Sequence, residues 1–228
     1  MNIVVNIYDP ETDVNNINGF TIVVDVFRAF TVSYFIMANN PQKYIAVDNI
    51  ELAFLLNHQD SKSLLIGERK GVKIDGFDYG NSPTEIVNKD FTNKTIIHTT
   101  TAGTKGLMRQ PKHNTVIVGS FVNANAITKY IHKNKIEVVN IYCTAEKGNL
   151  YGEEDYYFAE YLKKKIEKEE VDYIEIKKKL RIGSGKGFKE NGFAPYSDFE
   201  YCMDLDKFDS IIVRKSVESN CVILEKMV

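Results

Sequence analysis

The decisive stretch of this sequence is Leu64-Leu65-Ile66-Gly67-Glu68-Arg69-Lys70-Gly71, followed shortly by Gly76-Phe77-Asp78-Tyr79-Gly80-Asn81-Ser82-Pro83. An apolar run typical of a buried strand ends in a charged pair, Glu68-Arg69, and a glycine-rich loop. Glycine allows a backbone to lie close to a ligand with its N–H groups directed at it. The stretch therefore predicts a β-strand that leads into a binding loop for a charged small molecule. The structural alternative is an ion pair between Glu68 and Arg69 inside an omega-type surface loop.

Short apolar, β-branched runs alternate with longer helical segments along the rest of the chain. This alternation predicts an α/β fold with a mixed, largely parallel sheet flanked by helices. The last fifty residues lose the alternation, and their two strand-like runs are expected to form an antiparallel edge or a second small sheet. Strands are predicted at 3–7, 20–24, 44–47, 64–66, 95–98, 116–118, 138–142, 211–213 and 222–224, and helices near 28–39, 51–58, 84–88, 104–109, 124–134 and 155–168.

Size and composition fit one globular protein of 228 residues, 43% hydrophobic and 26% charged. We predict a single α/β domain over 1–228, or two tightly packed lobes with a boundary near 140–150. The net charge of -2 argues against a nucleic-acid partner. No apolar run approaches the roughly 18 residues of a membrane span, and the N-terminus has no basic leader. Three widely spaced cysteines without a C-x-x-C pair indicate neither disulfides nor zinc. We expect a cytoplasmic protein without a membrane partner, and a homodimer.

Polar residues follow four of the predicted strands, and ligands of open α/β sheets gather beyond the carboxyl ends of strands. The first such end is Val23-Val24-Asp25-Val26-Phe27-Arg28. Asp25 is a candidate metal ligand or nucleophile towards phosphorus, and Arg28 is a candidate phosphate ligand with two N–H groups. The alternative is that Asp25 caps the following helix and pairs with Arg28.

Two further strand ends carry hydroxyl groups at the start of a helix. They read Thr99-Thr100-Thr101-Ala102-Gly103-Thr104 and Gly119-Ser120-Phe121-Val122-Asn123. Hydroxyls and free N–H groups at a helix start can bind an anion, but they are also ordinary helix caps. Their recurrence at several strand ends favours one common site.

Glu153-Glu154-Asp155 opens the helix predicted at 155–168. Acids stabilise a helix N-terminus, which explains two of the three. The third is free to bind a hard cation such as Mg²⁺, which prefers one or two carboxylates together with waters and substrate oxygens. His98, near the expected site, is a minor acid–base candidate.

Together these motifs resemble the 2-phosphosulfolactate phosphatase family, the ComB-like enzymes. The resemblance covers about residues 20 to 160, and its most specific part is the Gly-Glu-Arg and Gly-Asn-Ser-Pro pair. It implies a Mg²⁺-dependent phosphatase that releases 3-sulfolactate and phosphate from a small, strongly acidic substrate. The matching stretches are Asp25-Val26-Phe27-Arg28-Ala29, Gly67-Glu68-Arg69, Gly76 to Pro83, Thr99 to Thr101 with Gly103-Thr104, Gly119 to Ala124, and Glu154-Asp155.

The resemblance and the residue chemistry lead to one set of expected roles. Catalysis is assigned to Asp25, Arg28, Glu68 and Arg69, with Mg²⁺ as cofactor. Asp25, Glu68 and Asp155 are expected to hold the metal, with Glu154 as the alternative to Asp155. The residues expected to bind the substrate are Asn81, Ser82, Thr100, Thr101, Gly103, Ser120 and Asn123.

Two departures from the family pattern bear on the substrate. Ala102 stands where the family has Asn, and Phe30 stands where it has a small hydroxyl residue. Two alternatives therefore accompany the phosphatase hypothesis: a non-catalytic protein that binds a small anion on the same scaffold, and a phosphatase with a different substrate.

Overall fold

The computed structural model describes residues 3–145, 148, 152–189, 193–218 and 220–227. Its strands form one open sheet in the order β1-β8-β2-β7-β9-β10-β3-β6-β4-β5. The strands are β1 (Val4–Tyr8), β2 (Phe20–Val24), β3 (Lys43–Val47), β4 (Ser63–Arg69), β5 (Val72–Lys73), β6 (Thr95–Thr99), β7 (Thr115–Gly119), β8 (Val138–Cys143), β9 (Ile211–Glu218) and β10 (Cys221–Met227). The helices are α1 (Ala29–Ala38), α2 (Ile50–Gln59), α3 (Pro83–Ile86), α4 (Gly103–Arg109), α5 (Ala124–Lys133), α6 (Glu153–Glu167), α7 (Tyr173–Ile182) and α8 (Tyr196–Cys202), with short 3-10 turns η1 (Val14–Asn16), η2 (Phe121–Asn123) and η3 (Ser184–Gly187).

The sheet consists of two parallel blocks joined by the C-terminal hairpin. Strands β1, β8, β2 and β7 pair in parallel, as do β3, β6 and β4. Strands β9 and β10 pair antiparallel with each other. β9 also pairs antiparallel with β7, and β10 pairs antiparallel with β3. The expectation of an antiparallel edge or a separate small sheet was therefore wrong. A strand covered on both faces carries consecutive apolar residues, and Val222-Ile223-Leu224 has this pattern.

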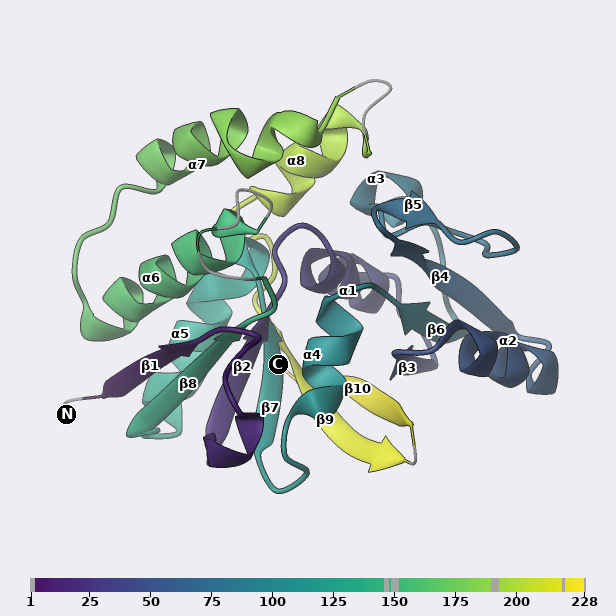
Figure 1. The fold of residues 1–228 in the computed structure, drawn as a ribbon, viewed down its shortest axis with the longest axis horizontal. Coiled ribbons are helices and arrows are strands. Elements are labelled where there is room, and N and C mark those ends of the chain that lie inside the picture. The colour runs from purple at the N-terminus through teal and green to yellow at the C-terminus, as the bar shows by residue number, and fades with distance from the viewer. Residues whose placement is uncertain (1–2, 146–147, 149–151, 190–192, 219, 228) are drawn as a thin grey trace.

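Side chains alternate between the two faces of the sheet, and helices cover both faces. Val23 packs into a core with α1 and α4, whereas Ile22 and Val24 pack with α5 and α6 on the other side. On that second side, farther along the sheet, α2 covers Ile45 and Val47 of β3. Figure 1 shows these layers and the helices α7 and α8 above them. The predicted α/β class, with its mixed, largely parallel sheet, is confirmed.

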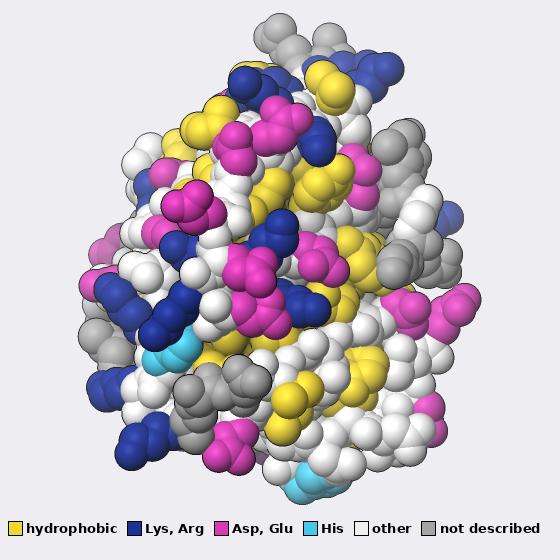
Figure 2. Space-filling view, turned by 90° about the vertical axis from the view of Figure 1, so that its left-hand side faces the viewer, with side chains coloured by type: hydrophobic (Ala, Val, Ile, Leu, Met, Phe, Trp, Pro, Cys, Tyr) yellow, Lys and Arg dark blue, Asp and Glu magenta, His cyan; other side chains and the backbone are white. Residues whose placement is uncertain are grey.

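Two helices near the C-terminus were absent from the prediction. The start of α7 has a readable signal, because the Asp172 side chain accepts a hydrogen bond from Glu175 N, as an N-cap does. On the side of the molecule that carries α6 and α7, Figure 2 shows acidic and basic side chains intermingled. Lys179 pairs with Glu175, and Lys177 pairs with Glu200. None of the helices in the described ranges is long and apolar enough to cross a membrane.

Candidate active site

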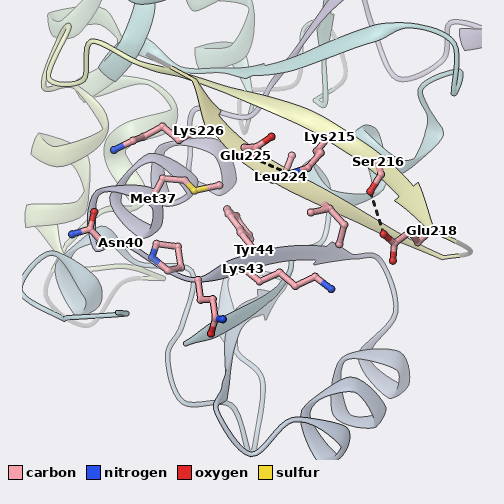
Figure 3. A pocket seen from close by; sticks show the side chains of 13 residues that line it. Met37, Asn40, Lys43, Tyr44, Lys215, Ser216, Glu218, Leu224, Glu225 and Lys226 are labelled. Carbon is pink, nitrogen blue, oxygen red and sulfur yellow. Dashed lines mark hydrogen bonds and ion pairs between the residues drawn. The ribbon is translucent and has the colours of Figure 1, made fainter. Parts of the chain in front are cut away.

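A cavity of about 460 Å³ lies where the chain leaves β2, β4 and β6. It collects charged groups from distant parts of the sequence, including three carboxylates. Its lining residues are Asp25, Phe27, Arg28, Glu68, Lys70, Gly71, Asn81, Thr101, Ala102, Glu154, Ser184 and Phe193. A somewhat larger groove of about 550 Å³ between β3 and β10 contains none of the predicted site residues, and its charges include the Lys215–Glu225 ion pair (Figure 3). The predicted site residues that line a cavity therefore lie in the smaller of the two.

Asp25 sits at the junction of three elements. It follows β2, and its Oδ1 accepts a hydrogen bond from Ala29 N at 2.9 Å, at the start of α1. The first residue of α4, Gly103, lies so close that a Cβ there would be 2.7 Å from Asp25 Oδ2 and 2.5 Å from the Ala29 Cβ. Gly103 therefore serves the site by its lack of a side chain, which lets α4 approach the carboxylate.

Arg28 lines the cavity with its guanidinium held by a buried acid. Its Nη1 lies 2.6 Å from Asp198 Oδ2, and both side chains are almost completely buried. Asp198 Oδ1 accepts hydrogen bonds from Ser82 Oγ at 2.8 Å and from Thr84 N at 2.9 Å. The Ser82 hydroxyl is thus engaged with Asp198, and Ser82 does not line the cavity. The Phe193 ring lies against the guanidinium, 5.2 Å from Cζ to ring centroid.

Glu68 connects the glycine-rich loop with the threonine loop. One oxygen accepts a hydrogen bond from Thr101 N at 2.6 Å, and the other accepts from Gly71 N at 2.7 Å and Thr101 Oγ1 at 3.0 Å. The neighbouring Arg69 does not line the cavity and donates to the Glu68 carbonyl oxygen and to Thr99 Oγ1. Because β4 extends to Arg69, the two side chains lie on opposite faces of the strand.

Three other predicted substrate ligands make hydrogen bonds at helix starts and do not line the cavity. Thr100 and Thr104 exchange hydrogen bonds across the start of α4, each backbone N–H donating to the other's hydroxyl. Ser120 and Asn123 form a capping box at η2, and the Ser120 hydroxyl lies 2.6 Å from Thr31 Oγ1 beneath α1. Thr101, by contrast, lines the cavity beside Ala102.

The acids at the start of α6 divide between two tasks. Asp155 accepts hydrogen bonds from Val26 N and from the backbone and hydroxyl of Thr144, which fixes α6 to the ends of β2 and β8. Glu154 lines the cavity, and its Oε2 is buried without a hydrogen-bond partner among the described residues. The sequence analysis expected Asp155 to face the site, with Glu154 as the alternative, and it is Glu154 that lines the cavity. Both are acids in the first turn of one helix, so the sequence does not distinguish them.

Burial changes the acidity of these carboxyl groups. It raises the pKa of Asp25 to about 6, and the negative charge of Glu68 adds to the rise. Burial also raises the pKa of Glu154 to about 8, with a further contribution from Asp25. The cavity therefore concentrates carboxyl groups that repel one another when ionised.

A model of the family described as 2-phosphosulpholactate phosphatase matches residues 7–216 of this chain. The chain belongs to the 2-phosphosulpholactate phosphatase family. Membership makes it a phosphatase, a phosphoric monoester hydrolase, as the sequence motifs predicted. The finding covers most of the chain and includes every residue that lines the cavity.

Similar proteins extend over nearly the whole length. One named probable 2-phosphosulfolactate phosphatase, from Carboxydothermus hydrogenoformans, is 34% identical over 220 residues, which cover 90% of each chain. A protein of the same name from Caldanaerobacter subterraneus subsp. tengcongensis is 31% identical and covers 83% of this chain and 85% of its own. One from Thermoplasma volcanium is 29% identical, with 86% and 89% covered.

Two carboxylates of this cavity, Asp25 and Glu154, could together hold a divalent ion. No group of three or more His, Cys, Asp or Glu side chains within the described ranges is arranged to hold a metal ion. Mg²⁺ is commonly bound through one or two carboxylates, with waters and substrate phosphate oxygens completing its shell. Asp25 Oδ2 and the unpartnered Glu154 Oε2 are such oxygens. Glu68 and Asp155, predicted as ligands, already accept several hydrogen bonds each.

Of the two departures from the family pattern, only one reaches the cavity. Ala102 lines it, whereas Phe30 lies in the hydrophobic core with 1% of its surface exposed. The site also contains residues to which the sequence analysis assigned no role: Lys70, Phe193, Ser184 and, behind Arg28, Asp198.

Proposed function

We propose that this chain is a Mg²⁺-dependent phosphatase that hydrolyses the phosphate ester of a small anionic hydroxy acid, with 2-phosphosulfolactate as the first substrate to test. The observation that carries the proposal is the meeting of Asp25, Glu154 and Arg28 in one cavity. The printed names of the similar proteins support the choice of first substrate.

The residues divide the work by charge. Asp25 and Glu154 would hold Mg²⁺, which when bound neutralises charge on the phosphoryl group during transfer. Arg28, oriented by Asp198, would donate hydrogen bonds to phosphate oxygens. Lys70, exposed at the cavity, suits the second acid group of the substrate. Phe27 and Phe193 would exclude bulk water, which strengthens these charge interactions.

Ala102 supports a second candidate, a phosphatase for a different phosphorylated hydroxy acid. Its methyl group stands in the cavity where the family pattern supplies an amide. An amide hydrogen bond to a charged group contributes about 1.5–3 kcal/mol, enough to change substrate preference by tenfold or more. The phosphate-handling residues would remain the same.

A substrate panel tests both candidates. Purified protein with Mg²⁺ is expected to release phosphate from 2-phosphosulfolactate or phospholactate, and EDTA is expected to abolish the release. The Asp25→Asn variant, purified in the same way, controls for contaminating phosphatases. Strongest turnover with another phosphorylated hydroxy acid would favour the second candidate. Stabilisation by anions without any phosphate release would instead indicate a non-catalytic binding protein.

The raised carboxyl pKa values predict how pH affects stability. The folded state holds protons that the unfolded chain releases near pH 4, so without metal the free energy of unfolding should fall as pH rises from about 4 to 9. For Asp25 alone the loss is on the order of 3 kcal/mol. Added Mg²⁺ should stabilise progressively more over the same range, because it displaces those protons. Thermal unfolding from pH 5 to 9, with and without Mg²⁺, measures both trends.

The matched variant for this experiment is Glu154→Gln, which keeps the shape of the side chain without its charge. It is expected to flatten the pH dependence in the absence of metal and to weaken the stabilisation by Mg²⁺. An unchanged Mg²⁺ effect in this variant would remove Glu154 from the proposed ligand set.

A further inference from the structure

His98 is buried on β6, and both of its ring nitrogens have a polar partner. Nδ1 lies 2.6 Å from the Tyr44 hydroxyl, and Nε2 lies 3.2 Å from Asn81 Oδ1. The Tyr44 hydroxyl in turn lies 2.7 Å from Ser33 Oγ on α1. Asn81 lines the active-site cavity. One continuous polar chain therefore runs from α1 through β3 and β6 to the cavity.

The chemistry of the partners fixes where the protons lie. Burial, with the positive charge of Arg69 nearby, lowers the pKa of His98 to about 3, so the ring is neutral and carries one N–H. The Asn81 oxygen can only accept, which places that N–H on Nε2. Nδ1 then accepts from the Tyr44 hydroxyl, whose own pKa burial raises. Ser33 Oγ lies 2.7 Å from this hydroxyl and donates to Ala29 O at 2.9 Å.

The contact with His98 leaves the other end of the Asn81 amide for the cavity. With Oδ1 held by His98, the Nδ2 group remains, and it makes no hydrogen bond to any other described residue. The opposite proton arrangement would turn the amide round and direct its oxygen at the ligand. An amide N–H attracts phosphate or carboxylate oxygens, whereas an amide oxygen repels them.

We propose that His98 is a positioning residue of the site, which holds Asn81 so that its amide N–H groups face an anionic substrate, with the Tyr44 hydroxyl as the partner of His98 Nδ1. The role rests on the proposed function, because it requires an anion in the cavity. His98 thus does not transfer protons to the substrate, and the minor acid–base role suggested by its position in the sequence is replaced.

Tyr44 offers a way to test the chain at a distance from the cavity. Its ring stands in the groove between β3 and β10, among the side chains labelled in Figure 3. Tyr44→Phe keeps this ring and removes only the hydroxyl that orients His98. Because the same hydroxyl also contacts Ser33 on α1, a cycle with Asn81 is needed to separate an effect carried by His98 from one carried by α1.

The test is a double-mutant cycle on the binding of inorganic phosphate in Mg²⁺, measured by titration calorimetry. Asn81→Ala is expected to weaken binding about tenfold, and Tyr44→Phe about three- to tenfold. In the Asn81→Ala background, Tyr44→Phe should have no further effect. His98→Gln, which retains an N–H donor, should keep more affinity than His98→Leu. Equal effects of Tyr44→Phe in both backgrounds would overturn the proposal.

A spectroscopic readout separates this proposal from the proposed function. Nitrogen-15 spectra of histidine-labelled protein should show His98 as the Nε2–H tautomer; the other three histidines are exposed, and their assignments come from single His→Gln variants. An Nδ1–H tautomer would overturn the positioning role even if the phosphatase activity is found. Wild type that neither binds phosphate nor hydrolyses any ester would remove the proposed function, and this role with it.

Discussion

Replacing Asp25 with Asn is expected to reduce phosphate release by at least about 10³-fold while the protein stays folded. Asn retains an oxygen that can accept from Ala29 N, so the start of α1 keeps its hydrogen bond. The substitution removes the negative charge that would hold Mg²⁺ in the cavity. Turnover at saturating substrate and Mg²⁺ measures the loss, and circular dichroism measures the retained fold.

Asp25→Asn is expected to lower activity but not stability. Because burial disfavours the charged form of Asp25, Asp25→Asn should unfold at the same or a higher temperature than wild type at pH 8 without metal. Asp75→Asn, at an exposed loop position, is the matched control and should change neither turnover nor stability. Normal turnover in Asp25→Asn would exclude Asp25 from the catalytic machinery.

The convergence of strand ends was predictable from sequence because ligands collect at such ends in α/β folds. Asp25 and Thr101 follow β2 and β6, Glu68 lies near the end of β4, and all three line the cavity. Ser120 was also expected at the site, and its neighbour Gly119 pairs with Val24, the residue before Asp25. Ser120 nevertheless does not line the cavity, because Thr31 of α1 lies against its hydroxyl. A helix can cover the end of a strand and keep a ligand away from it. This depends on tertiary packing, which the pattern of apolar residues in the sequence does not reveal.

An error of a few residues in a strand boundary changed the expected site. The apolar run predicted a strand that ends at Ile66, with Glu68 and Arg69 together in a loop. The strand continues to Arg69, and alternation along it turns Glu68 towards the cavity and Arg69 away. The face on which a polar side chain at a strand end lies can therefore be assigned only when the last residue of the strand is known.

Helix geometry limits prediction in a similar way at α6. Consecutive residues of a helix point about 100° apart, so at most one or two of three adjacent acids can face one cavity. Glu154 faces it and Asp155 does not. Asp198, 170 residues from Arg28 in sequence, has no local signal beyond that of an acid in the first turn of a helix.

Asp198→Ala is expected to lower the free energy of unfolding by about 3–5 kcal/mol, the cost of removing one partner from a buried ion pair. Arg28 would remain buried without its counter-charge, and the donors of Ser82 and Thr84 would lose their common acceptor. Urea unfolding of wild type and variant measures the difference. Glu200→Ala on the same helix is the control, because Glu200 forms exposed ion pairs worth less than about 1 kcal/mol.

Asp198→Asn separates the structural role of this acid from its effect on the site. Its Oδ1 can still accept from Ser82 and Thr84, so it should be more stable than Asp198→Ala, but its amide N–H groups would face the donors of Arg28. The guanidinium would then shift, and the KM for substrate should rise about tenfold. A stability loss for Asp198→Ala no larger than that of Glu200→Ala would contradict this account, because a buried arginine without a counter-charge should lower the free energy of unfolding by more than an exposed ion pair contributes.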